Sequence, residues 1–369
     1  MTVKLDIRKV ESHENTEFYI SAVPDQNAPI KEQAAQMFNA ITDSLNTENA
    51  HVLQERIFTH DSALQNVSDI RSQAYGPLDD GVPPTILLCN QGLNGPFAGI
   101  QIHAIRSEKK PQVIKLHEKP CGRLFKTTGR EYLTLSNISA QDPDSNTKQA
   151  RKMLEKAETA LNLLDADFLN VARTWMWLGN ILSWYDDFNH VRNEFFTERG
   201  VIGTPHRQYM PASTGIGLKP PGNPICAMDL VAVLEPEDSI EFLPAVGKQQ
   251  CALEYGSAFS RASKAVTPAA VTVFVSGTAA IDATGATTNI ENPAGQINDT
   301  VENVRAVLKD MKCSDQDVVQ AVAYCKNTDV EKIFHQYRKK LSWPWLTIVC
   351  DICRPELLFE IEVTAVIRQ

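Results

Sequence analysis

The sequence has no apolar run as long as the about eighteen residues that a membrane-spanning helix requires, and its beginning, MTVKLDIRKVESHENTEFYI, has no apolar stretch of signal-peptide length. It also has no basic run longer than a Lys-Lys pair, and its net charge is -9. Because nucleic-acid-binding proteins usually carry a basic patch, that class of function is disfavoured. These absences predict a cytoplasmic protein with neither nucleic-acid nor membrane partners.

The eight cysteines are scattered along the chain and do not form the paired CxxC clusters that bind zinc. This scatter also disfavours a disulfide framework. One CxxC does occur, at Cys350 and Cys353, but the surrounding TIVCDIC is typical of a strand, in which residues three apart point to opposite faces. The sequence lacks a glycine-rich phosphate loop, a histidine-rich cluster and a Ser-His-Asp order. We therefore expect neither a metal nor a cofactor.

A weak internal repeat organises what the sequence does contain. With 369 residues and 43% hydrophobic content, the chain can bury cores in two or three domains. Near its end, VTVFVSGTAAI is typical of a buried strand that ends in a Ser-Gly turn, and an amphipathic helix led by Gln296 follows. The order continues with a strand (DQDVVQAVAYCKN), a helix (EKIFHQYRKKL) and two closing strands (WLTIVCDIC and LLFEIEVTAVI).

The middle of the chain repeats this order from EYLTLSNIS onward, at a constant spacing. An offset of 147 residues relates Gln149 to Gln296, Leu161 to Leu308 and Val171 to Val318, and one of 133 relates Pro211 to Pro344 and Ala232 to Ala365. The N-terminal third, from FYISAV to FAGIQIHAIR, is the most eroded copy. We therefore predict an α/β (α+β) chain of three units at residues 1–110, 111–240 and 241–369; the alternative is three unrelated α/β segments.

Four segments of the last unit resemble the RidA/YjgF family: VFVSGTAAI, QINDTVENVRAVLKDM, SDQDVVQAVAYCKN and CRPELLFEIEVTAVI. Members of that family normally assemble as homotrimers with ligand sites between neighbouring subunits. The resemblance implies that three tandem copies form a pseudo-trimer, with sheets inside and helices outside. Because such a ring closes within one chain, we expect a monomer.

A second resemblance is more specific. The segment RTWMWLGNILSWYDDFNHVRNEFF, followed by PASTGIG, FSRA, SGTA and CRPELLFEIE, is similar to the chorismatases, from about residue 120 to the C-terminus. Aromatic stretches such as TWMWL usually belong to the core, so the combination of motifs carries the resemblance. It implies an enzyme that takes chorismate, a dicarboxylate with an enolpyruvyl ether, and releases pyruvate.

Cleavage of the enol ether begins with delivery of a proton to the terminal methylene carbon, which requires an acid that stays protonated near neutral pH. Glu360 follows Leu357, Leu358 and Phe359, and burial among such apolar neighbours raises the pKa of a carboxyl group. The resemblance implies the same role, because the family's proton-donating glutamate matches this position. Glu362 shares its face of the strand and either raises the pKa of Glu360 or is held by a neighbouring hydrogen-bond donor.

A carboxylate substrate is best held by a planar, bidentate guanidinium group. Arg354 matches the arginine with which RidA-like proteins hold a substrate carboxylate. Further candidates for substrate binding come from the motif segments of the middle and last units: Arg173, Arg261, Tyr209, Thr214 and Gly277. Only the third copy keeps arginine and glutamate together, which predicts one working site per chain, at the border with the middle unit.

The sequence indicates the reaction product less clearly than it indicates the substrate. Chorismatases form either a dihydroxycyclohexadiene carboxylate by hydrolysis or hydroxybenzoates. In hydroxybenzoate formers a cysteine lies seven positions before the catalytic glutamate, as Cys353 does here, which favours 3-hydroxybenzoate and a direct role of Cys353 in catalysis. Ala262, at a second discriminating position, resembles the hydrolysing type.

Two other functions fit the same residues. A RidA-type enamine or imine deaminase would use the same arginine and needs no cofactor, but it would have three similar sites in a trimer of short chains. A ligand-binding or regulatory protein would need no chemistry at all. Retention of Glu360 in an apolar segment argues against this second alternative.

Overall fold

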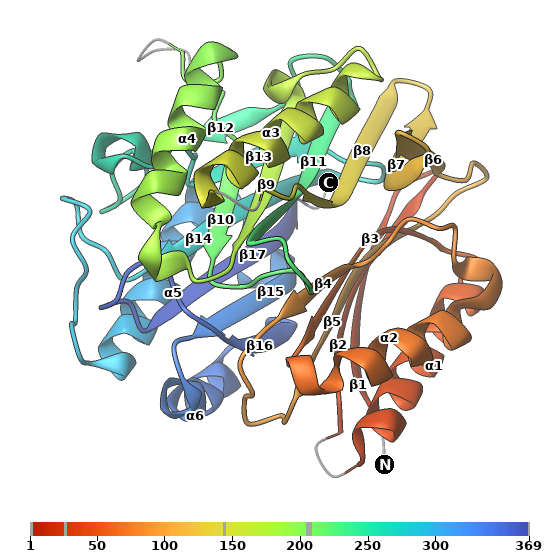
Figure 1. Cartoon of the computed structure of the whole chain (residues 1–369), viewed down its shortest axis with the longest axis horizontal. Helices are drawn as coiled ribbons and strands as arrows, with labels where there is room; N and C mark the ends of the chain where they lie inside the picture. Colours follow the sequence, from red (N-terminus) through yellow and green to blue (C-terminus); the bar gives the residue numbers. More distant parts are fainter. Residues whose placement is uncertain (1–2, 26–27, 143–144, 204–208, 368–369) are drawn as a thin grey trace.

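The computed structural model describes residues 3–25, 28–142, 145–203 and 209–367. Three mixed sheets, each covered by two helices, follow one another along the chain (Figure 1). The sheets span residues 4–106, 112–235 and 241–367, and the predicted fold class is therefore confirmed. The domain boundaries at 110 and 240 stay a prediction.

The first sheet has the strand order β1-β2-β5-β3-β4. Its elements are β1 (Lys4–Glu11), β2 (Thr16–Val23), α1 (Ile30–Thr47), β3 (His51–Thr59), α2 (Leu64–Tyr75), β4 (Thr85–Leu88) and β5 (Phe97–Arg106).

The second sheet has the order β10-β9-β11-β8-β7-β6. Its elements are β6 (Gln112–Leu116), β7 (Lys119–Thr127), β8 (Arg130–Ser139), α3 (Asn146–Asn162), β9 (Val171–Leu178), α4 (Tyr185–Glu198), β10 (Ala212–Ile216) and β11 (Cys226–Glu235).

The third sheet has the order β12-β13-β14-β17-β15-β16. Its elements are β12 (Glu241–Leu243), β13 (Ala262–Val266), β14 (Val271–Ala279), α5 (Pro293–Asp310), β15 (Val318–Cys325), α6 (Thr328–Tyr337), β16 (Trp345–Val349) and β17 (Phe359–Ile367).

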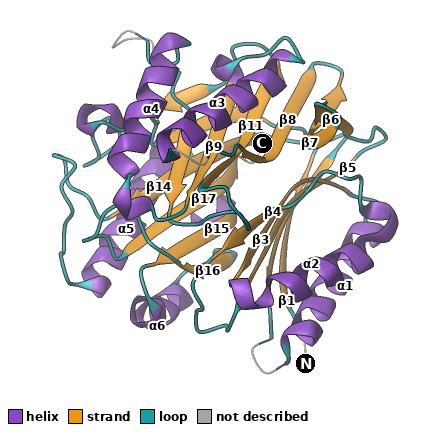
Figure 2. Ribbon diagram, in the orientation of Figure 1, coloured by secondary structure: helices purple, strands orange, loops and turns teal. Residues whose placement is uncertain are grey.

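The three sheets share one plan. In each, the last strand lies between two antiparallel neighbours, and the outer strand beyond it runs parallel to its own neighbour (β4 on β3, β10 on β9, β16 on β15). The helices lie on the outside of the molecule and the sheets face its middle (Figure 2). This is the pseudo-trimeric arrangement that the repeat predicts.

Local sequence chemistry explains the helix positions. In α5, the Asn292 side chain accepts a hydrogen bond from the Gly295 amide, and Pro293 occupies the first helical position, where no amide donor is needed. Residues Ile297, Val301, Val304 and Leu308 form its buried face, which packs on β14 and β17. The N-terminal ends of α3 and α6 are capped in the same way, by Ser145 and Asn327.

Two buried ion pairs join neighbouring sheets near the middle of the molecule. Arg173 Nη2 on β9 lies 2.9 Å from Glu362 Oε2 on β17, and Arg56 Nε on β3 lies 3.2 Å from Asp229 Oδ2 on β11. Glu362 and Asp229 occupy equivalent positions, since the strand neighbours of both are equivalent residues of β15 and β9. Gln101 takes this position in the first sheet.

The structure corrects two local predictions. The segment TIVCDIC is not one strand, because β16 ends at Val349 and the chain turns away before β17 begins at Phe359. Cys353 therefore lies in a loop and not in a sheet. Tyr209 precedes β10 and packs edge-on against the Phe242 ring, 6.4 Å between centroids, outside any strand.

Candidate active site

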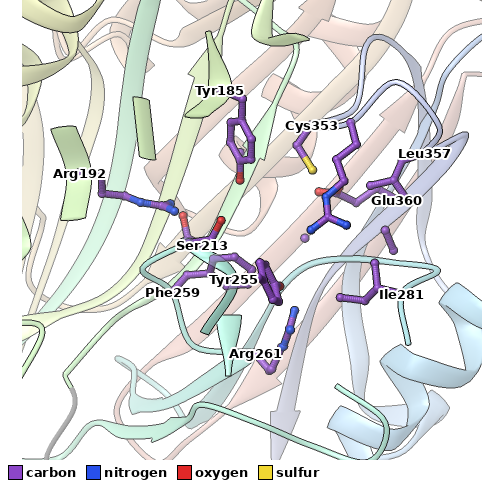
Figure 3. A pocket seen from close by; sticks show the side chains of 15 residues that line it. Tyr185, Arg192, Ser213, Tyr255, Phe259, Arg261, Ile281, Cys353, Leu357 and Glu360 are labelled. Carbon is purple, nitrogen blue, oxygen red and sulfur yellow. The ribbon is translucent and has the colours of Figure 1, made fainter. Parts of the chain in front are cut away.

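A pocket lies where the second and third sheets meet. Strand β10 of the second sheet packs against β14 of the third. Ser213 and Gly215 on β10 line the pocket together with Gly277 and Glu360 of the third sheet, and Figure 3 shows Ser213 and Glu360. The cavity has a volume of about 50 Å³. The loop before β17 and a short turn at Ala252–Tyr255 complete the lining.

Glu360 is the one carboxylic acid among the described residues that line this pocket. The side chain is 4% exposed, and no described residue donates a hydrogen bond to its carboxyl group. The pKa of Glu360 is raised to about 8, mainly by burial and also by the nearby Glu362 carboxylate, whereas the Arg173 guanidinium acts in the opposite direction. At neutral pH this carboxyl group therefore carries a proton that it can donate.

Space for the Glu360 carboxyl group exists because residue 277 is glycine. A Cβ atom at Gly277 would lie 2.1 Å from Glu360 Oε1 and 3.2 Å from Thr214 Cγ2. Thr214 is buried directly behind the pocket, where its hydroxyl oxygen accepts a hydrogen bond from Arg173 Nη2 at 2.5 Å. The absence of a side chain at Gly277 thus fixes where the acid can lie.

Three arginines line the same pocket. Arg354 donates from Nη1 to the Gly285 carbonyl at 2.6 Å, and Arg261 donates from Nε and Nη2 to the Gln250 carbonyl. Both guanidinium groups lie 5.4 Å from the centre of the Tyr255 ring. These contacts place two cations on the third-sheet side of the pocket.

Arg192 supplies a third cation from α4, on the opposite wall. Its side chain is 1% exposed and donates from Nη2 to Asn189 Oδ1 at 2.7 Å, but its buried Nε has no hydrogen-bond partner. Burial lowers the pKa of Arg192, and the neighbouring Tyr185 counteracts that effect. A buried guanidinium group with an unused donor is suited to hold an anion.

Tyr185 and Cys353 complete the wall between Arg192 and Glu360 (Figure 3). Burial raises the pKa of the Tyr185 phenol and of the Cys353 thiol, so both are neutral at neutral pH. The Tyr185 ring also packs over Gly215. The pocket thus combines one neutral acid, several neutral hydrogen-bonding groups and three arginines.

Comparison with known proteins identifies the fold. Across 99% of both chains, the structure matches the crystal structure of a chorismatase with a TM-score of 0.60 and 17% sequence identity. The chain has the chorismatase fold. The resemblance carried by the sequence motifs is confirmed at this level.

Other comparisons match single units of this chorismatase fold. Residues 255–367 match the family Ribonuc_L-PSP, described as endoribonuclease L-PSP. A YjgF-family protein from Neisseria meningitidis has 20% identity over 35% of this chain and 96% of its own, with a TM-score of 0.28. A member of the same family from Mycobacterium tuberculosis has 22% identity over 35% of this chain and all of its own, with a TM-score of 0.27. The sequence matches none of the curated proteins compared.

The pocket of this chorismatase fold brings together most of the predicted site residues. The lining contains Glu360, Cys353, Arg354, Arg261 and Gly277, and Thr214 lies immediately behind it. Arg354 and Arg261 come from different loops of the last unit and meet around one tyrosine ring.

Besides Thr214, three predicted residues are not part of the lining. Arg173 lies behind the pocket, because its guanidinium group is bonded to Glu362 and Thr214. Ala262 is fully buried in the apolar core of the third unit, opposite Val275. Tyr209, packed on Phe242, is also outside the lining.

Sequence reasoning missed Arg192, Tyr185 and Tyr255. A signal for Arg192 was present, since it lies four residues after Phe188 and four before Phe196, on the buried stripe of α4. A charged residue within an apolar stripe is unusual and indicates either an internal ion pair or a ligand. Tyr255 had no comparable signal, because it lies in a short irregular turn.

The equivalent positions in the other two units cannot support the same chemistry. Strand register places Ala227 on β11 and Gly99 on β5 where Glu360 lies on β17. The Leu346 side chain occupies the space beside Gly99, 2.6 Å from where a Cβ atom would be. Neither of these two equivalent positions therefore carries a carboxyl group.

The part of the chain that the structure describes contains no group of three or more His, Cys, Asp or Glu side chains arranged to hold a metal ion. No helix among these residues is long and apolar enough to cross a membrane.

Proposed function

We propose that this protein is a chorismatase, which cleaves the enolpyruvyl ether of chorismate and releases pyruvate. The observation that carries the proposal is the buried carboxyl group of Glu360, with its raised pKa, in a pocket lined by three arginines. Such a combination suits a substrate that is an anion and that must accept a proton on carbon.

Glu360 acts as the general acid. Its proton adds to the terminal methylene carbon of the enol ether, which converts the ether carbon into an oxocarbenium ion. The Glu360 carboxylate that remains stabilises this cation. If water traps the cation, the hemiketal breaks its bond to the ring oxygen, which leaves as the ring hydroxyl group, and the proton released from the water returns to Glu360. If the neighbouring ring hydroxyl group traps the cation and loses its proton to Glu360, that oxygen leaves the ring with the pyruvate carbon. The former ether oxygen then stays on the ring as the phenol oxygen, and the ring loses one C–H proton as it becomes aromatic.

The arginines hold the two carboxylates of chorismate. Arg192 lies on the wall formed by α4, whereas Arg354 and Arg261 lie on the wall formed by the third unit (Figure 3). Guanidinium groups on opposite walls fit a ligand with carboxylates at both ends. Tyr185 supplies a neutral hydroxyl group between them.

The proposed product is 3-hydroxybenzoate, formed with pyruvate and without net consumption of water. Cys353 supports it, because the neutral thiol lines the pocket beside Glu360. The alternative product, a dihydroxycyclohexadiene carboxylate, requires a water molecule to be added. Ala262, which resembles the hydrolysing type, lies outside the lining and does not contact the ligand space.

The test is to incubate the purified protein with chorismate and to follow pyruvate with a coupled lactate dehydrogenase assay. Chromatography and mass spectrometry identify the ring product. We expect pyruvate release that falls as the pH rises through about 8, where Glu360 loses its proton. An enamine substrate in the same buffer tests for deaminase activity.

Two variants make the test specific. Glu360→Gln should reduce pyruvate release at least a hundredfold, within the range that loss of a general acid typically causes, on the order of 10² to 10⁴. Glu302→Gln changes an exposed glutamate on α5 and serves as the matched control. Parental activity of Glu360→Gln, or ammonia release from the enamine without pyruvate release from chorismate, would overturn the proposal.

A further inference from the structure

A second carboxyl group lies directly behind the proposed acid. Glu362 is two residues after Glu360 on β17, so both side chains point to the same face of the sheet. Glu362 is 5% exposed and accepts hydrogen bonds from Trp175 Nε1 at 3.1 Å and Arg173 Nη2 at 2.9 Å. Two such donors, one of them a guanidinium group, are the partners of an ionised carboxylate.

The two carboxyl groups differ in their surroundings. Glu362 accepts hydrogen bonds from two donors, Arg173 and Trp175, whereas no hydrogen bond to the Glu360 carboxyl group is found among the described residues. When two carboxyl groups lie near each other and one of them is protonated, the proton resides on the one whose ionised form is less well stabilised. The contacts therefore assign the charge to Glu362 and the proton to Glu360.

Of the middle and last units, only the last has a second carboxyl group near this buried charge. Asp229, equivalent to Glu362, is also buried and accepts from Arg56, Thr85 and the Asn137 amide. The residue two positions before it is Ala227, which has no proton to hold. The buried anion can therefore serve interface packing in the middle unit, but in the last unit it also faces an acid.

We propose that Glu362, held in place by Arg173 and Trp175, is a positioning residue whose fixed negative charge keeps the neighbouring Glu360 carboxyl group protonated and ready to donate. This proposal rests on the proposed role of Glu360 as the general acid. It extends that role, because Glu362 would act without touching the substrate.

The other groups around Glu360 leave this role to the Glu362–Arg173 pair. Several other titratable or charged groups face Glu360. They come from the loop before β17, from α4, from the segment around β13, and from β9 and β15: Cys350, Cys353, Arg354, Tyr185, Arg192, Arg261, Tyr255, Arg173 and Tyr324. Burial raises the pKa of each of these cysteines and tyrosines, so they are neutral near pH 8. The pocket arginines keep a constant positive charge in that range.

The first experiment is a pH profile of pyruvate release by Glu362→Gln. Removing the anion leaves the Arg173 cation unopposed, so the pKa of Glu360 should fall. We expect the pH at which pyruvate release declines on the alkaline side of the profile to fall by on the order of one unit. At a fixed alkaline pH this corresponds to about a tenfold loss of protonated Glu360. Glutamine retains hydrogen-bonding atoms for Trp175 and a similar volume.

A second variant changes the sign. Arg173→Gln removes the cation but keeps an amide donor for Glu362, so the carboxyl pair should hold its last proton to higher pH. The alkaline decline of pyruvate release should then shift to higher pH. Glu55→Gln is the matched control, because Glu55 is an equally buried glutamate in an ion pair with Arg71 at 2.7 Å, inside the first unit. Glu55→Gln should lower the free energy of unfolding without shifting the pH at which pyruvate release declines.

Infrared titration of the protonated carboxyl band provides a readout that does not need the substrate. The band that disappears in Glu360→Gln belongs to Glu360, and its midpoint should fall in Glu362→Gln and rise in Arg173→Gln. If one variant does not fold, the other decides, since the two predicted shifts are opposite.

The two proposals fail in different ways. A parent that releases no pyruvate from chorismate overturns the proposed function, while the infrared midpoints still test the pairing of Glu360 with Glu362. Active parent protein with an unchanged alkaline decline and unchanged midpoints in Glu362→Gln and Arg173→Gln, or with shifts that Glu55→Gln reproduces, overturns the positioning role.

Discussion

Replacing Glu360 by glutamine should stabilise the fold, and the gain should depend on pH. The folded-state pKa of this group is about 8, against 4.5 for an ordinary glutamate. Between these two values the folded chain holds a proton that the unfolded chain has released. Rising pH therefore favours unfolding of the parent throughout that window.

The magnitude follows from the width of the window. Each pH unit between the two pKa values costs the parent about 1.4 kcal/mol of unfolding free energy. From pH 4.5 to pH 7 the cost reaches roughly 3 kcal/mol, and it stops growing above about pH 8. Glutamine does not titrate, so the free energy of unfolding of the variant does not fall with pH for this reason.

The assay is urea unfolding of the parent and of Glu360→Gln at several values between pH 5 and about pH 9, with the free energy of unfolding extrapolated to zero urea. We expect the difference between the two proteins to increase with pH and then to level off. The exposed-site variant Glu302→Gln should show a difference that does not vary over this range. A pH-independent difference for Glu360→Gln would refute the raised pKa and, with it, the reasoning about a neutral acid.

Further predictions concern the pocket and the assembly. Gly277→Ala should lower pyruvate release at least tenfold in the coupled assay, because the added methyl group would lie 2.1 Å from Glu360 Oε1; an unchanged rate would show that the acid need not lie there. Arg192→Lys should raise KM for chorismate about tenfold or more with a smaller change in kcat, since lysine cannot form the bidentate contact. Cys353→Ala should shift the ring product away from 3-hydroxybenzoate in chromatography, and an unaltered product ratio would contradict its role. Sedimentation should give a particle of 41.0 kDa, and a trimer would contradict the closed ring.

The fold was largely predictable because the repeat placed strands and helices by comparison between copies. The regular spacing from Gln149 and Gln296 onward located equivalent elements even where the apolar pattern was weak. Strands β6 and β12 were not predicted, because both are short strands at sheet edges with few buried residues. Strand β7, which lies inside the second sheet, was missed as well. Their pairing depends on neighbours more than on their own residues.

The site was predictable only where a motif fixed the residue. Glu360 and Arg354 lie in one short segment, so their proximity needed no tertiary information. Arg173 was misplaced because every residue of β9 is buried, and a strand buried on both faces gives no sign of which face borders a pocket. Its partner Glu362 lies 189 residues away in the sequence, a pairing that only the assembled sheets reveal.

The inequality of the three units has a consequence for how such a protein can change. In a ring of identical subunits every substitution occurs three times, so an alteration that favours one interface is forced on the other two. In this chain Gly99 and Ala227 stand where the last unit has Glu360, and a leucine has filled the vacated space beside Gly99. The third interface can therefore carry a buried carboxyl group beside three arginines without the same groups being imposed on the other two.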